Sequence, residues 1–123
     1  MQIVLPWPNA KLNPNRSKGV HWASTSALRK KARSDAYLLT RGALAKSLAA
    51  TGKPFDSAAT LPLTITFVQP DKRARDRDNL LAALKPSLDG IADSLGCNDS
   101  QFEPITIRRA YGPKPGSVLV EIA

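Results

Sequence analysis

The sequence contains a single cysteine, Cys97, and a single histidine, His21, among its 123 residues. One cysteine cannot form an intrachain disulfide bond, which favours a reducing, cytoplasmic setting. The two residues together are too few for the four ligands of a typical structural zinc site. No run of residues approaches the ~20 apolar side chains of a membrane-spanning helix, and the opening MQIVLPWPNA is too short and proline-rich for a signal peptide. We therefore expect a cytoplasmic protein with no membrane partner.

Acidic residues are also scarce, with 10 Asp and Glu against 18 Lys and Arg, which gives a net charge of +8. A charge of this size attracts polyanions, so nucleic acid is the leading candidate partner. The alternatives are a protein beside the ribosome and a basic protein whose charge serves only solubility. The length suits one domain over residues 1–123, with a single core.

Apolar periodicity predicts a mixed α+β fold in the order β-α-β-α-β-β, with a four-stranded mixed sheet and two helices. The predicted elements are a strand over 2–6, a helix from Ser24 or Ser26 to about Ala50, a strand over 61–69, a second helix that Gly96 ends, and strands over 105–111 and 117–122. We expect the last two strands to pair as a hairpin through the turn GPKPG. Pro86 should kink the second helix.

The stretch QPDKRARDRDNL, residues 69–80, sets two carboxylates inside a basic cluster directly after a predicted strand. In an extended chain residues i and i+2 point the same way, so Asp76 and Asp78 can face one point. Two like charges held together repel, and a divalent cation such as Mg²⁺, which prefers oxygen ligands, relieves that repulsion. The alternative for Asp78 is a capping role at the start of the following helix.

A third carboxylate would complete a metal site, and Asp99 in the loop after the second helix is the candidate. A straight helix starting at Asp78 would place that loop ~25–30 Å away. A kink at Pro86, or a second subunit, would shorten this span. Asp89 and Asp93 are rival ligands, but their simpler interpretation is a solvated helix face with Lys85 and Asp89 paired at i,i+4.

The basic residues beside the carboxylates fit a phosphodiester substrate, because they can hold the backbone while the metal-bound carboxylates address the scissile phosphate. These expected contacts are Lys72, Arg73, Arg75 and Arg77, with Asn15 and Arg16 of the basic loop over residues 8–23. The alternative is that the arginines only pair with the aspartates at the surface. The residues by themselves thus predict a metal-dependent enzyme that cleaves phosphodiesters.

Four segments in chain order, LPWP, NPNR, PDKRARDRDNL and KPSLDGIADSLGCNDSQF, resemble the RusA family of Holliday junction resolvases. The resemblance covers most of the chain and is densest from Pro70 to Phe102. It implies a homodimeric, Mg²⁺-dependent endonuclease without an organic cofactor, which resolves four-way DNA junctions by paired symmetric nicks in recombination and repair. Such enzymes are often encoded by phages and prophages and act in the bacterial cytoplasm.

The resemblance assigns roles to individual residues. It implies Asp76, Asp78 and Asp99 as the metal-binding catalytic triad, Asn79 as the second residue of the family's DN pair, and Arg75 as a DNA contact. The family's lysine, four residues after the second aspartate, is replaced here by Ala82. Lys85 lies on much the same helical face and is the candidate for that catalytic role.

Other classes of function remain open from the sequence. One is a non-catalytic basic DNA- or RNA-binding module whose aspartates only cap and pair, and another is an interaction protein. A third keeps the nuclease but changes its substrate to flap, other branched or linear DNA. For the implied dimer, Leu119 and Ile122, an edge strand or the first helix are the candidate interfaces, and a C2 dimer would match the symmetry of a four-way junction.

Overall fold

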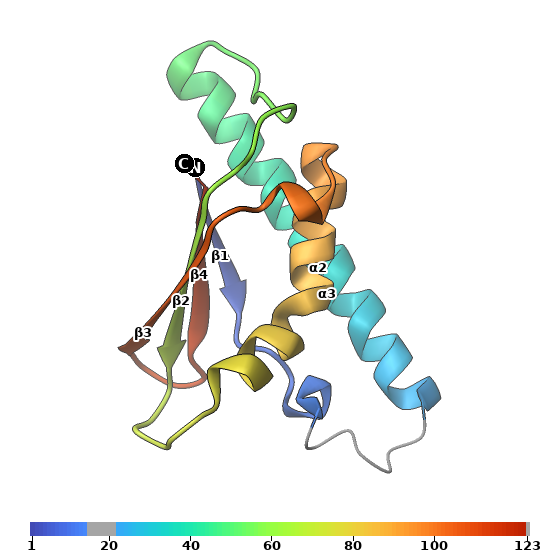
Figure 1. Ribbon diagram of the computed structural model, residues 1–123, viewed down its shortest axis with the longest axis vertical. Helices are drawn as coiled ribbons and strands as arrows, with labels where there is room; N and C mark the ends of the chain where they lie inside the picture. The colour runs from blue at the N-terminus through green and yellow to red at the C-terminus, as the bar shows by residue number, and fades with distance from the viewer. Residues whose placement is uncertain (15–21, 123) are drawn as a thin grey trace.

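The structure, a computed structural model, describes residues 1–14 and 22–122. Its elements follow the predicted order, and the mixed α+β class with two helices and a four-stranded sheet is confirmed (Figure 1). The elements are β1 (Gln2–Pro6), the 3₁₀ turn η1 (Ala10–Leu12), α2 (Trp22–Thr51), β2 (Leu63–Gln69), α3 (Arg77–Leu95), the 3₁₀ turn η2 (Asp99–Gln101), β3 (Ile105–Tyr111) and β4 (Ser117–Ile122). Within the described residues, no helix is long and apolar enough to cross a membrane.

The sheet has the strand order β1-β4-β2-β3, in which β4 pairs antiparallel with β1 and β2, and β3 pairs parallel with β2. The predicted hairpin between the last two strands is therefore wrong, because β2 lies between them. The connection over 112–116 crosses the end of β2, where a Cβ on Gly116 would lie 2.9 Å from the Val68 carbonyl oxygen. The physical reason is burial: β4 buries every second residue and gains from two neighbours, whereas the largely exposed β3 suits an edge.

The core lies between one face of the sheet and the two helices, which both pack on that side (Figure 1). The alternation predicted for β2 is present, with Leu63, Ile65 and Phe67 buried and the residues between them half-buried. No described helix covers the other face of the sheet (Figure 1). Ile122 belongs to the core, at 3% exposure, so the expectation that it contributes to a subunit interface is wrong.

The helix that carries most of the candidate site residues, α3, starts and ends at capping residues. Asp76 is its N-cap, with a carboxylate oxygen that accepts a hydrogen bond from the backbone N–H of Asp78 at 2.8 Å. Gly96 ends the helix in the left-handed conformation, at φ 70°, as predicted. Pro86 lies inside the helix, and Figure 1 shows the axis of α3 changing direction along its length, in line with the expected kink.

Candidate functional site

The two aspartates of the RDRD segment occupy different positions at the start of α3. Asp76 has extended backbone angles and caps the helix, which corrects the alternative that Asp78 is the cap. Asp78 is already helical, so the extended i,i+2 geometry expected for the pair does not apply. Both side chains are exposed. One Asp76 oxygen is used by the cap, whereas the Asp78 carboxylate has no hydrogen-bond or ion-pair partner among the described residues.

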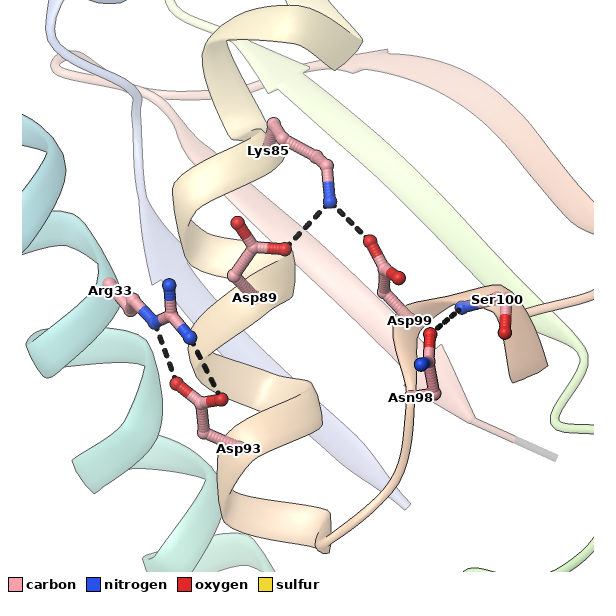
Figure 2. A network of polar contacts seen from close by, with 7 residues as sticks. All are labelled: Arg33, Lys85, Asp89, Asp93, Asn98, Asp99 and Ser100. Atoms are coloured by element: carbon pink, nitrogen blue, oxygen red, sulfur yellow. Dashed lines mark hydrogen bonds and ion pairs between the residues drawn. The ribbon is translucent and has the colours of Figure 1, made fainter.

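The loop after α3 folds back along the helix and brings Asp99 to Lys85 (Figure 2). The Lys85 ammonium lies between the carboxylates of Asp99 and Asp89, with the Asp89 contact at 2.7 Å. The cap of η2 holds this arrangement, since the Asn98 side chain accepts a hydrogen bond from the Ser100 N–H. Lys85 and Asp89 follow Asp78 by seven and eleven residues, so the return of the loop cuts the expected span to ~10–17 Å along the helix axis.

These contacts set the charge states around Lys85. The hydrogen bonds that Lys85 donates to Asp89 and Asp99 raise the pKa of the Lys85 ammonium above its ordinary value. The hydrogen bond from Lys85 in turn lowers the pKa of the Asp99 carboxyl. Asp99 and Lys85 are therefore both charged at neutral pH, and the two carboxylates share the single positive charge of the ammonium.

The structure does not bring the three implied metal ligands together within one protomer. Among the described residues, no three Asp, Glu, His or Cys side chains gather into a group that could hold a metal ion. Asp76 and Asp78 lie at the helix start, and Asp99 lies about two turns further along. Mg²⁺ usually binds through one or two carboxylates and keeps several waters. Asp76 keeps one oxygen outside the cap bond and Asp78 is unpaired among the described residues, so each carboxylate has an oxygen available to a cation.

The two rival metal ligands, Asp89 and Asp93, each form an ion pair with a basic side chain. Asp89 pairs with Lys85, as the i,i+4 alternative predicted. Asp93 forms two hydrogen bonds with the Arg33 guanidinium of α2, at 2.6 and 3.0 Å (Figure 2). This bond lowers the pKa of Asp93 and raises that of Arg33. Asp93 thus links the two helices and is a structural residue.

Arg75, which was expected to contact DNA, is largely paired with neighbouring residues of the protein. Its guanidinium pairs with both oxygens of Asp71, at 2.8 and 3.3 Å, and its side chain is 18% exposed. The same group lies 5.3 Å from the centre of the Trp7 ring. The pair with Arg75, followed by the Arg73 backbone N–H, lowers the pKa of Asp71 to about 2. Arg75 therefore braces the loop before α3.

The other residues expected to contact DNA differ in their position and exposure. Lys72, Arg73 and Arg77 are exposed around the start of α3, and Asn79 is half-buried there. Asn15 and Arg16 lie outside the described residues. A basic residue that sequence reasoning missed is Arg109 of β3, whose guanidinium donates to the Arg75 carbonyl at 2.8 Å. The assumed hairpin concealed it, because only the pairing of β3 with β2 places Arg109 beside the site.

A pocket of about 370 Å³ adjoins the carboxylates and was not predicted. We call it the η1–α3 pocket, because it lies between the segment of η1 and the start of α3. Its lining is Trp7, Pro8, Asn9, Ala10, Asn13, Arg73, Ala74, Arg75, Asp76, Asn79, Leu80 and Ala83. The proline-rich LPWPN segment indicated a loop with an aromatic residue, but no local pattern could place it against α3.

Comparisons with known proteins find a relative whose function is not described. No protein-family model matches the chain. A protein of Xylella fastidiosa (strain Temecula1 / ATCC 700964), described as uncharacterized, is 40% identical over 100 residues, which cover 81% of this chain and 61% of that protein. The chain thus spans less than two thirds of the length of this relative, whose description names no activity.

Proposed function

We propose that the protein is a Mg²⁺-dependent, structure-specific endodeoxyribonuclease of the RusA type that resolves four-way DNA junctions as a homodimer. One observation carries the proposal: the fold-back of η2, which sets Asp99 against Lys85. Lys85 shares a face of α3 with Asp78, because seven residues make almost two full turns. Asp78, Lys85 and Asp99, three of the residues that the RusA resemblance implies, thus lie along one side of α3.

The residues around the start of α3 suit a phosphodiester substrate. Exposed Arg73 and Arg77 would bind the DNA backbone beside the carboxylates. Exposed ion pairs contribute little free energy, so a phosphate oxygen can displace Asp89 or Asp99 from Lys85. When bound by Asp76 and Asp78, Mg²⁺ would activate a water and stabilise charge on the phosphate. Lys85 would then add positive charge next to the reacting group.

A homodimer would place one such site on each of the two strands that a resolvase cuts. Two surfaces are available to a second copy. One is the open face of the sheet, where Val4 is 61% exposed, and the other is α2, where Leu38 is 64% and Leu48 is 50% exposed. Exposed apolar side chains of this kind are typical of surfaces that bind another protein.

The test is nicking of a labelled synthetic four-way junction with Mg²⁺ or with EDTA, beside a linear duplex of the same sequence. We expect symmetric cuts on the junction alone, only with Mg²⁺. Asp78→Asn should slow cutting by roughly a hundredfold or more and leave binding intact or tighter, because it removes a ligand and a negative charge. The matched control is Asp56→Asn, which changes an exposed aspartate in the loop before β2 and should cut at the wild-type rate.

A second candidate is a basic DNA-binding module that does not cut. The observation favouring it is the double ion pair of Lys85, together with the lack of a three-carboxylate group among the described residues. Tight junction binding without cutting under any divalent metal would establish this alternative and overturn the nuclease. Equal cutting of flap and four-way substrates would keep the nuclease and change its substrate to branched DNA in general.

A further inference from the structure

We propose that the η1–α3 pocket takes a single nucleobase turned out of the DNA next to the cut site. The inference rests on the proposed function, because it refines the substrate of that same site.

The lining of the pocket matches a flat heteroaromatic group better than a phosphate. Its buried part is apolar, with Leu80 at 6% exposure and Ala83 at 5%, beside the half-buried Trp7 ring. Of the two arginines on the lining, Arg75 is already paired with Asp71, and the carboxylate of Asp76 would repel a phosphate. A nucleobase has apolar faces and a polar edge, and aromatic side chains are its usual stacking partners.

The polar groups of the pocket can read the edge of a base. Asn79 is half-buried and makes no side-chain hydrogen bond within the described part of the chain, so its amide is available as donor and acceptor. Asn9 uses its side-chain oxygen on the Lys11 N–H, which leaves its NH₂ group for a ligand. Asparagine amides and carboxylates are common partners of base edges. The volume of about 370 Å³ lies at the small end of ligand pockets and suits a group the size of one nucleotide.

The pocket is held in shape by contacts behind its lining. The Trp7 ring packs edge-on against Phe67 of β2, with ring centres 6.1 Å apart at an interplanar angle of 80°. Arg75 lies over the same ring and is fixed by Asp71, and Arg109 of β3 holds the Arg75 carbonyl. A site that is already formed loses less conformational freedom on binding, so its contacts contribute more fully to affinity.

The position of the pocket would link binding of a base to the position of the cut. Asp76 both lines the pocket and caps α3, next to Asp78. A base held there would fix which phosphate lies beside the two carboxylates. Bases at a branch point have weakened stacking and are cheaper to turn out than those of an intact duplex. The pocket would therefore select both the branch and the position of the nick.

The first experiment measures junction binding in EDTA, so that no cutting intervenes, on four-way junctions with one abasic nucleotide at each position around the branch. We expect one position to weaken binding about tenfold, the effect of losing one stacked base. Asn79→Ala should weaken binding of the intact junction and leave binding of that abasic junction unchanged. The control Gln2→Ala removes an exposed amide from β1 and should bind both junctions like the wild type.

A second readout does not depend on junctions. Trp22→Phe leaves Trp7 as the sole tryptophan, since the chain has only two. Contact with a base should then change Trp7 fluorescence when a deoxynucleoside 5′-monophosphate is added, and deoxyribose 5-phosphate should leave it unchanged.

The outcomes separate the two proposals. The base pocket is overturned if every abasic junction binds equally, if Asn79→Ala weakens binding of intact and abasic DNA equally, or if the Trp7 signal does not change. Nicking would persist in each of these cases. Base-dependent binding and a Trp7 response without nicking under any divalent metal support the pocket and overturn the nuclease alone.

Discussion

At the scale of single residues, the aspartates around α3 differ in what they contact. Asp76 holds a backbone N–H, Asp78 is unpaired among the described residues, and Asp99 is paired with a lysine. These identical side chains therefore differ in their capacity to bind a metal ion or a proton. A carboxylate oxygen that already accepts a bond from the backbone or from a cation must first give up that bond. The RDRD pattern predicted carboxylates near phosphate-binding residues, but it could not say which oxygen was in use.

Asp71 gives a prediction for acid stability. Its folded pKa of about 2 lies below its ordinary value of 3.8, chiefly because of the Arg75 hydrogen bond. A lowered folded pKa means that the contribution of Asp71 to stability is complete above roughly pH 5 and is lost as the pH falls towards about 2. Asp71→Asn should therefore lose stability relative to the wild type at neutral pH and converge with it in acid.

The measurement is the urea midpoint of unfolding between pH 7 and pH 2 for both proteins. Asp56→Asn, which changes an exposed aspartate whose oxygen accepts from the Ala58 N–H, should follow the wild-type curve. A constant difference between Asp71→Asn and the wild type across this range would show that the Arg75 pair does not set the pH dependence.

At the scale of elements, the site depends on how α3 is positioned by its neighbours. Its N-terminus follows β2 by a short loop, its C-terminal loop returns as η2, and its middle packs on α2. Gly90 allows that packing: a Cβ there would lie 2.1 Å from the Arg33 carbonyl oxygen. The salt bridge between Arg33 and Asp93 joins the same two helices one turn further along α3.

This close approach predicts opposite effects for two glycine-to-alanine changes in helices. Alanine has the better helix propensity by about 1 kcal/mol, so Gly42→Ala on α2, with nothing within 4 Å, should stabilise the protein by up to that amount. Gly90→Ala should instead destabilise it by roughly 1–3 kcal/mol, because the added methyl forces the helices apart. Urea unfolding measures both. Equal stabilisation by the two changes would mean that α2 and α3 do not touch at Gly90.

At the scale of the whole molecule, the net charge of +8 surrounds a site that itself contains several carboxylates. Three exposed basic residues, Lys72, Arg73 and Arg77, lie around the start of α3. In the proposed function, the positive surface would attract DNA over long range, and the local carboxylates would bind the metal against that background. The net charge would then govern association with DNA, and the site would govern the cutting that follows.

Phosphate contacts make affinity depend on salt. If the three basic residues of each protomer contact one phosphate apiece, the proposed homodimer makes about six phosphate contacts, and junction binding should weaken by roughly a thousandfold between 50 and 200 mM salt. Arg77→Ala removes one contact from each protomer and should reduce the slope of log K against log salt by about 2. Lys46→Ala changes an exposed lysine in the C-terminal half of α2, a part of the helix that lies away from the start of α3 (Figure 1), and as the matched control it should keep the wild-type slope. A slope unchanged by Arg77→Ala would remove Arg77 from the DNA contacts.

The sequence by itself determined the order of the elements, most of their boundaries and the residue types of the site. These follow from local rules: the alternation of apolar residues in β2 and the left-handed Gly96 at the end of α3 involve only neighbours along the chain. The tertiary structure alone decided that β2 separates β3 from β4, that Asp99 returns to Lys85, and that Trp7 and Asn9 share a pocket with Asn79. The physical reason is that these contacts join segments distant in sequence, so they depend on the burial and packing of the whole core.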